Sequence, residues 1–250
     1  MTSSTSFDFT HFKYLNIGGG NFCHREDGWL NLDCFFADTN YYGWDKGAID
    51  ITHNLLEDKP IDLPDKCLRG VYTEHTIEHL PDLNVEYLFR EIHRILRDGG
   101  MLKIAVPDAE LIYNKLIDPE TPVTDYPHAF IHGDETKEQP FLGLIITPLR
   151  DNISNSNVAG IINKYPMDYA LNLLVDLAGE ITPEMNKEHP EWHVSWWSYD
   201  KLKDVLERSG FKNVSGRLNR HGSGVKAFRK DYLDLTAHKI TLRMECSKND

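Results

Sequence analysis

The chain lacks the features that mark membrane-spanning, secreted and disulfide-rich proteins. Its best apolar stretch, residues 141–149, is far shorter than the roughly 20 residues of a membrane-spanning helix. The N-terminus is polar and rich in Ser and Thr, without the basic start and apolar core of a signal peptide. The 4 cysteines form no Cys-x-x-Cys pair, so we expect reduced thiols. These absences favour a cytoplasmic protein without a membrane span.

Basic residues are too few for a protein that binds along an extended stretch of nucleic acid. Lys and Arg number 27 against 39 Asp and Glu, which leaves a net charge of −12 at pH 7. A long nucleic-acid footprint needs many cations to neutralise phosphates, so the composition disfavours it. A small anionic substrate held by a few local cations is compatible with this charge. The 250 residues suit one large domain, alone or with a sizeable insertion.

Strand-like and helix-like segments alternate through the first half of the chain. Residues 83–96 carry apolar side chains at steps of three and four, which predicts a helix that stops at Gly99-Gly100. A nearly continuous apolar strand and a second helix follow, over 101–106 and 109–117. Earlier strand candidates span 13–17, 29–32 and 67–72. This alternation predicts an α/β fold with an open, mostly parallel sheet and helices on both faces.

The pattern changes at residue 118, where prolines begin to interrupt nearly every segment up to about 195. We therefore expect a lid-like, substrate-side insertion over 118–195, with 168–177 as its most regular helix. The main domain would comprise 13–117 and 196–250, after a flexible N-terminus over 1–12. Its last part has a helix at 199–208 and strands at 213–218 and 239–246. The final strand alternates apolar and polar residues, as in a half-exposed edge hairpin.

Two features follow the first two strands at the edge where such sheets bind ligands. Gly18, Gly19 and Gly20 form a turn in which the missing Cβ atoms let a ligand approach the backbone. Asp33 ends the next strand, and an acid at that place commonly binds both hydroxyls of a ribose. The two features together favour a cofactor of the adenosine type.

Five stretches of the sequence, taken in their order along the chain, resemble those of a known protein family. They are LNIGGG at 15–20, GWLNLD at 28–33, HTIEHL at 75–80, LRDGGMLKIAVPD at 96–108 and HVSWWSYDKLKDVLERSGFKNV at 193–214. The sequence resembles class I S-adenosylmethionine (SAM)-dependent methyltransferases, and most of all a little-characterised type found with surface-polysaccharide genes. The resemblance covers about 13–117 and 193–246, and it does not extend to the central insertion.

The resemblance implies a fold, a cofactor and a reaction. The fold would be a Rossmann-like, mostly parallel seven-stranded sheet with a C-terminal antiparallel hairpin. SAM would be the cofactor and S-adenosylhomocysteine the product. The acceptor would be an oxygen, or less favourably a nitrogen, of a small polar molecule, preferably a sugar or a phosphorylated or nucleotide-activated capsule precursor. The oligomeric state is open, and a homodimer is compatible with the sequence.

The resemblance also implies roles for individual residues. The glycine turn would lie beside the methionyl part and the ribose, Asp33 would bind the ribose hydroxyls, and the 50–51 pair would flank the adenine. Residues 73–75 would lie under the methionyl group. Two departures stand out, since Asn16 replaces a frequent acid and Arg69-Gly70 replaces Phe-Asp. The expected cofactor residues are Asn16, Gly18, Gly19, Gly20, Asp33, Asp50, Ile51, Thr73 and Glu74.

His75 is the first candidate for the general base, because histidine titrates near neutrality. The alternative is that His75 only shapes the floor of the cofactor site. Glu78 and His79 would cap and pack the following segment. Small-RNA 3′-end methyltransferases instead carry two glutamates and a histidine here as metal ligands. Glu74 and Glu78 are four residues apart rather than three, so that match is imperfect and we expect no metal.

Further candidates lie on the acceptor side. Residues 193–199 are unusually aromatic, and Ser198 would cap the helix that begins at Tyr199. We expect His193 and Tyr199 to face the acceptor as catalytic residues, with Trp197 as a pocket wall. Core packing is the rival role for Trp197.

Histidine pairs and a basic stretch complete the candidates. His128 with His132, and His189 with His193, are four residues apart, but neighbouring prolines disfavour a helical metal site. His132 would then face a polar pocket from a loop. Arg217 and Arg220 would bind a phosphate on the acceptor, or lie on a mobile hairpin. A catalytically weak scaffold with a methyltransferase fold, and a metal-assisted RNA-end methyltransferase, remain the alternative functions.

Overall fold

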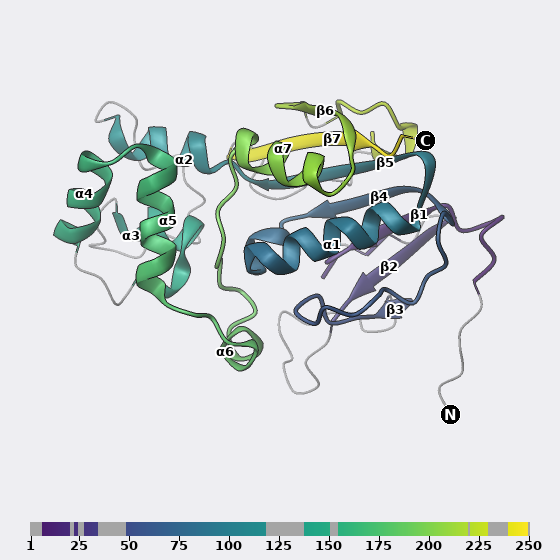
Figure 1. Ribbon diagram of the computed structural model, residues 1–250, viewed down its shortest axis with the longest axis horizontal. Helices are drawn as coiled ribbons and strands as arrows, with labels where there is room; N and C mark the ends of the chain where they lie inside the picture. Colours follow the sequence, from purple (N-terminus) through teal and green to yellow (C-terminus); the bar gives the residue numbers. More distant parts are fainter. Residues whose placement is uncertain are drawn as a thin grey trace.

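The computed structural model describes residues 7–20, 23–24, 28–34, 49–118, 138–150, 155–219, 221–229 and 240–249. Within these residues a seven-stranded sheet has the order β3-β2-β1-β4-β5-β7-β6 (Figure 1). The strands are β1 (Tyr14–Ile17), β2 (Trp29–Asp33), β3 (Ile51–Thr52), β4 (Leu68–Glu74), β5 (Leu96–Pro107), β6 (Lys212–Gly216) and β7 (Thr241–Ser247). The first five strands run parallel, and β7 is antiparallel to both of its neighbours. The predicted fold class, with its C-terminal antiparallel hairpin, is confirmed.

Seven α-helices and three short 3-10 helices are described around and beside the sheet. The helices are α1 (Asp82–Ile95), α2 (Ala109–Ile117), α3 (Glu138–Ile145), α4 (Asn155–Lys164), α5 (Met167–Ala178), α6 (Pro183–Glu188) and α7 (Tyr199–Arg208). The 3-10 helices are η3 (Ile77–His79), η6 (Thr147–Leu149) and η7 (Lys226–Phe228). The bounds of α2 and α7 are those predicted from the sequence. Each begins after a side chain that accepts a backbone N–H, Asp108 for α2 and Ser198 for α7.

The two faces of the sheet have different partners, because strand residues alternate between them. One face packs against the apolar stripes of α1 and α7, which lie in front of the sheet in Figure 1. The opposite face carries aromatic side chains of the strands, packed against Phe228 of η7. The carboxyl ends of β1, β2 and β4 lie at one edge of this two-sided core, and the candidate site is built there.

Two expectations about strands are wrong. β7 was expected to be a half-exposed edge, but it lies between β5 and β6 and is buried along its whole length. Its polar positions alternate because they face the side covered by the 223–228 segment, where Glu245 accepts from Ser223 Oγ and Gly224 N. Gly99 and Gly100 were expected to stop a helix. The helix ends at Ile95, and both glycines belong to β5.

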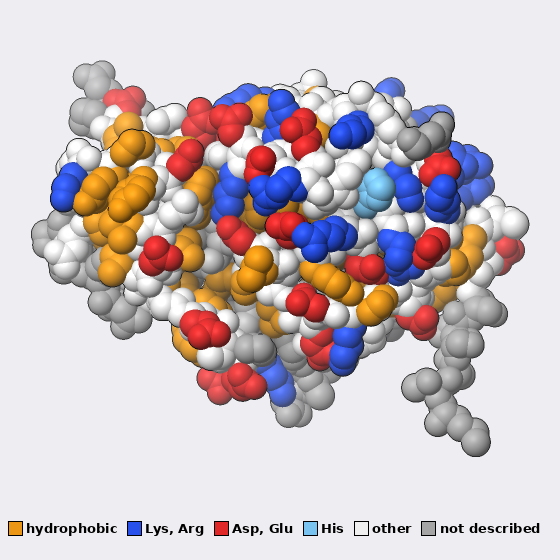
Figure 2. Space-filling model, viewed as in Figure 1, with side chains coloured by type: hydrophobic (Ala, Val, Ile, Leu, Met, Phe, Trp, Pro, Cys, Tyr) orange, Lys and Arg blue, Asp and Glu red, His pale blue; other side chains and the backbone are white. Residues whose placement is uncertain are grey.

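The described part of the 118–195 region forms a helical layer beside the sheet, on the left in Figure 1. Apolar side chains of α3, α4 and α5 share a second buried cluster with α2, Trp196 and Ile240. Figure 2 shows apolar side chains gathered at this end of the molecule, where Tyr169 is 58% exposed on α5. Over α1 and α7 the same view shows charges of both signs interspersed.

The N-terminal segment is packed where the structure describes it. Phe7, Phe9 and Phe12 are partly buried against the main core. Residues 1–6 of the expected flexible N-terminus lie outside the described residues. Within the described ranges, no helix combines the length and the apolar character that crossing a bilayer requires.

Candidate active site

The glycine turn after β1 is held against the segment that follows β4. Gly18 has a φ of +69°, a conformation that L side chains rarely adopt, and its N–H donates to the Leu32 carbonyl at 2.9 Å. A Cβ at this position would lie 2.3 Å from the Thr76 hydroxyl and methyl group. The Thr76 hydroxyl in turn donates to the Glu74 carbonyl at 3.0 Å. Thr76 therefore joins the turn to the end of β4.

Asp33 lies across from this turn, at the end of β2. One carboxylate oxygen accepts the Gly20 N–H at 2.7 Å, and the other accepts the Cys34 N–H at 2.7 Å. Burial raises the pKa of Asp33, and these two hydrogen bonds only partly offset the rise. A carboxylate offers about four acceptor positions, so two hydroxyl donors can still bind. The site is thus chemically suited to a vicinal diol.

Asn16 and Asp50 belong to one polar network centred on Asn31, in which Asn16 is buried and Asp50 is exposed. The Asn16 amide donates to Asn31 Oδ1 at 3.3 Å, and Asn31 also exchanges hydrogen bonds with the backbone of His24. Asp50 Oδ2 accepts the Asn31 N–H at 2.8 Å. This network locks the spacing of β1, β2 and the approach to β3, where Ile51 is buried in the core. The expected contacts of Asn16 and Asp50 with a cofactor stay predictions.

The last two residues of β4, Thr73 and Glu74, differ in whether their side chains are hydrogen-bonded. Thr73 is 1% exposed, and its hydroxyl has no hydrogen-bond partner among the described residues. Glu74 accepts the Tyr72 hydroxyl at 2.9 Å, which turns it toward the aromatic face of the sheet. An orphaned buried hydroxyl costs roughly 1–3 kcal/mol, so Thr73 is the residue here that gains most from a bound polar group.

His75 follows β4 in a left-handed conformation, with φ of +47°. Its Nδ1 lies 3.0 Å from Glu78 Oε1, and its Nε2 lies 3.1 Å from the Thr241 hydroxyl. Since an ionised carboxylate only accepts, Nδ1 carries a proton, and in the neutral ring Nε2 then has a lone pair. A carboxylate that orients an imidazole in this way is the arrangement of a general base.

The 3-10 helix η3 is clamped to the segment that leaves the insertion. The Glu78 carbonyl accepts the Val194 and Ser195 N–H groups at 2.8 and 3.2 Å. Ser195 Oγ donates to the Ile77 carbonyl at 3.1 Å, and Asn186 donates to the His79 carbonyl at 2.8 Å. These bonds bring together residues more than a hundred positions apart in the sequence, and they place His193 beside η3.

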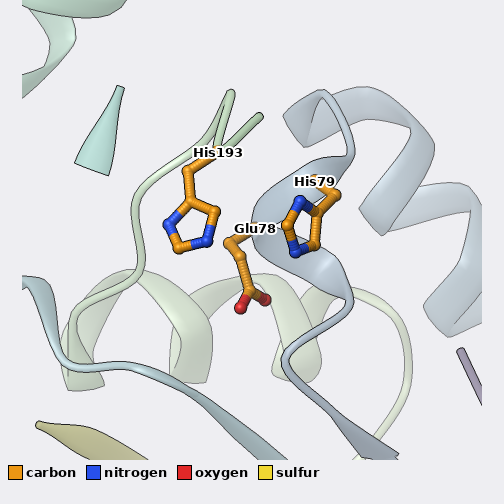
Figure 3. A group of neighbouring side chains, drawn as sticks. All are labelled: Glu78, His79 and His193. Carbon is orange, nitrogen blue, oxygen red and sulfur yellow. The ribbon is translucent and has the colours of Figure 1, made fainter. Parts of the chain in front are cut away.

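Glu78, His79 and His193 consequently converge (Figure 3). One potential ligand atom from each lies within 4.8 Å of the other two. The two rings meet edge to face, with centroids 4.8 Å apart. Glu78 is 1% exposed and His193 is 8% exposed. Glu74, which the metal-site alternative included, does not belong to this group, whereas His193 does.

Burial and neighbouring charges shift the pKa values of Glu78 and His193 in this group. Burial raises the pKa of Glu78, but the hydrogen bond from His75 and the surrounding histidines outweigh it and hold that pKa at about 2. Burial, together with the neighbouring His79, lowers the pKa of His193 to about 4. At neutral pH the group therefore contains an ionised carboxylate and a neutral His193 imidazole, which is too weak a base for proton abstraction at that pH.

Three other expected site residues lie elsewhere. Trp197 is 1% exposed in the main core and donates to Ser195 Oγ at 3.0 Å, so it packs in the core, and its expected role as a pocket wall stays a prediction. The Tyr199 ring packs against Gly216, where a Cβ would come within 2.3 Å of it. Arg217 pairs with Glu110 and approaches Asp108 at 3.7 Å. His132 and Arg220 lie outside the described residues.

Sequence reasoning missed Thr76, Thr241 and Thr147 as site-forming residues. Thr147 Oγ1 accepts the His193 N–H at 3.0 Å, and the His193 carbonyl accepts the Thr147 N–H at 2.9 Å. Each threonine reaches its partner from a distant segment, so no local spacing marks it. Only the position of Thr76, four residues after the predicted strand at 67–72, was a usable signal.

Comparison with known proteins finds no matching family model and no matching curated protein. Among solved structures, the chain is similar to a SAM-dependent methyltransferase from Archaeoglobus fulgidus, with 15% identity, 95% of this chain and 86% of that one covered, and a TM-score of 0.46. A possible histamine N-methyltransferase from Thermotoga maritima shares 14% identity over 95% and 82%, with a TM-score of 0.45. A methyltransferase from Mesorhizobium loti shares 15% over 94% and 90%, with a TM-score of 0.44. At these values the likeness assigns no acceptor.

Proposed function

We propose that the protein is a SAM-dependent methyltransferase that acts on an oxygen, or less favourably a nitrogen, of a small polar acceptor. The observation that carries the proposal is the pairing of the Gly18–Gly20 turn with Asp33 at the carboxyl edge of the sheet. Gly20 N–H and Asp33 Oδ2 lie 2.7 Å apart, so the turn and the acid form one unit. In open parallel sheets this edge is where nucleotides bind, and the acid after the second strand binds the ribose.

Two further features of the described residues bear on an adenosine-type group. The left-handed Gly18 turns the chain sharply after β1, and the Thr76 side chain fills the space that a Cβ would need. The Thr73 hydroxyl is buried and lacks a hydrogen-bond partner among the described residues. A ligand that brings two hydroxyl donors to Asp33 would also lower the raised pKa of that carboxyl.

In the proposed reaction, different residues would bind the cofactor and transfer the proton. Asp33 and the glycine turn would hold the ribose and the methionyl part. Bound SAM would supply an electrophilic methyl group for the acceptor oxygen, with S-adenosylhomocysteine as the leaving group. His75 Nε2, which lies 3.1 Å from the Thr241 hydroxyl, would take the proton from the acceptor hydroxyl. Glu78 would stabilise the resulting imidazolium through the 3.0 Å contact with Nδ1.

The favoured acceptor is a sugar, or a phosphorylated or nucleotide-activated precursor of a surface polysaccharide. The sequence resemblance supports this class. The net charge of −12 argues for a small acceptor and against a long nucleic acid. On the face in Figure 2, basic and acidic side chains are interspersed and form no continuous basic track.

Calorimetric titration with SAM and with S-adenosylhomocysteine tests the proposal. We expect both to bind with micromolar dissociation constants, and a screen of sugar and nucleotide-sugar precursors with methyl-labelled SAM then identifies the acceptor. Absence of binding by either nucleoside would reject the enzyme. The chain would then be a scaffold that keeps the fold and has lost the cofactor.

A further inference from the structure

The group formed by Glu78, His79 and His193 has three ligand-bearing side chains, and the proposed reaction gives a role only to Glu78. Two of them come from the η3 segment after β4, and the third comes from the far end of the insertion. Their potential ligand atoms lie within 4.8 Å of one another. Because backbone hydrogen bonds clamp the two segments together, the convergence is part of the fold and does not depend on a single flexible loop.

The hydrogen bonds of the two rings define which nitrogen faces inward. His193 Nδ1 lies 2.7 Å from the Leu144 carbonyl, and His79 Nδ1 lies 3.0 Å from the Trp192 carbonyl. A carbonyl oxygen can only accept, so both Nδ1 atoms carry protons. In the neutral form of each ring Nε2 therefore has a lone pair, and Figure 3 shows one nitrogen of each ring directed toward the Glu78 carboxylate. A backbone carbonyl on the outer nitrogen is the usual support of a metal-binding histidine.

The carboxylate supplies the second independent observation. Glu78 Oε1 contacts His75 at 3.0 Å, but Glu78 Oε2 is buried and has no hydrogen-bond partner among the described residues. A cation bound by Glu78, His79 and His193 would give Glu78 Oε2 the partner that it lacks among the described residues, and it would accept the lone pairs of the two rings.

We propose that Glu78, His79 and His193 bind a divalent ion of the first transition row, with zinc as the reference ion. Imidazole and carboxylate suit this class, and two histidines with one glutamate leave a coordination position open for water or another oxygen ligand. Zinc bonds of about 2.0–2.1 Å place tetrahedral ligands about 3.3 Å apart, so binding draws the three side chains inward from their present spacing. His75 orients the carboxylate from outside the coordination sphere.

The ion binding is testable without the proposed methyl transfer. The full-length protein, freed of metal by a chelator, is titrated with zinc chloride by calorimetry and with cobalt chloride by visible absorption. We expect one equivalent of each ion, and cobalt d–d bands typical of a site with nitrogen and oxygen ligands. The same samples are titrated with SAM, so that loss of the ion site and failure of the cofactor site give different results.

Three variants and one matched control assign the ligands. Glu78→Gln, His79→Gln and His193→Gln should each weaken zinc binding by more than about 100-fold, since even an outer partner costs about 10–100-fold. His189→Gln is the control, because His189 is a more exposed histidine of the same segment whose Nδ1 lies 3.5 Å from Glu191. It should bind zinc as the unaltered chain does.

Circular dichroism establishes that each variant is folded, and His79→Gln is decisive if the two buried substitutions unfold the protein, since His79 is only partly buried. Absence of stoichiometric binding to the unaltered chain would overturn the proposal. Equal zinc affinity in folded His79→Gln and in the control would overturn it as well. In either case the group would be a hydrogen-bonded support for His75.

Discussion

The Thr76 side chain fills the space beside Gly18 that a Cβ atom would need. The distance from such a Cβ to Thr76 Oγ1 or Cγ2 would be 2.3 Å, and Gly18 also has a φ of +69°. A glycine is therefore required twice over, by conformation and by contact. The contact couples the turn after β1 to the histidine-bearing segment after β4, so the two segments of the proposed site are in direct contact.

Substitution of Gly18 tests this coupling. Gly18→Ala should lower the free energy of unfolding by about 2–5 kcal/mol, the sum of left-handed strain and overpacking against Thr76. Gly99→Ala is the matched control, because Gly99 has a φ of +71° and nothing within 4 Å of a Cβ. It should lose only about 1–2 kcal/mol. Urea unfolding measures both, and equal losses would show that the Thr76 contact is easily relieved.

Asp33 is expected to bind the ribose hydroxyls. Asp33→Ala should weaken SAM binding by about 1–3 kcal/mol, or roughly 5- to 150-fold, since a buried hydrogen-bonding partner is removed. Asp98→Ala is the control, because Asp98 only forms an exposed pair with Lys66 at 2.8 Å. Calorimetry on both variants decides the matter. An unchanged SAM affinity in a folded Asp33→Ala protein would remove Asp33 from the cofactor site.

Two half-buried cysteines, Cys34 and Cys67, can report where the cofactor binds through their rates of alkylation. Burial is the main cause that raises the pKa of Cys34 and of Cys67 to about 11. Because only the thiolate reacts, alkylation at pH 8 should be about 100-fold slower than for a thiol of pKa 9, and it should still rise at pH 10. Cys34 adjoins Asp33, so SAM should protect Cys34 and leave Cys67 unaltered. Peptide mass spectrometry after timed alkylation measures this, and equal protection of both would contradict the placement.

Trp197 is expected to stabilise the fold and to take no part in acceptor binding. Trp197→Ala should cost about 3–5 kcal/mol of stability, because the side chain is 1% exposed in the main core. Trp192→Ala is the comparison, since Trp192 is half-buried and stacks on His189 at 4.0 Å. Its loss should be much smaller. Thermal unfolding of the two variants checks the order, and the reverse order would contradict the role of Trp197 in core packing.

Arg217 is expected to contribute little to stability. It is 54% exposed and pairs with Glu110 at the start of α2. The coupling energy in a double-mutant cycle of Arg217→Gln and Glu110→Gln should be below about 1 kcal/mol and should vanish near 1 M salt. A coupling that survives high salt would indicate a more buried pair. Because Glu110 and Asp108 already balance the charge of Arg217, Arg217→Gln should leave the KM for a phosphorylated acceptor unaltered.

The sequence by itself determined the order of six strands and four helices, because apolar periodicity is a local property, but β3, α3, α4 and α6 were not identified. The bounds of α2 and α7 followed from this pattern, and Ser198 marked the start of α7. The glycine turn and Asp33 were also identifiable, since each ends a strand and all parallel strands end at one edge. The position of β7 was not, because alternating polarity marks both an exposed edge strand and a buried strand between two unlike faces.

Only the tertiary structure decided which polar residues meet. His193 lies beside Glu78 because backbone bonds join residues 193–195 to η3, over a separation that no spacing rule reaches. The same packing buries Trp197 in the core and gives His75 its partner Thr241 from β7. Local sequence patterns determine which segments become helices and strands. Burial and long-range hydrogen bonds determine which side chains lie next to one another, and the chemistry of the site depends on these tertiary contacts.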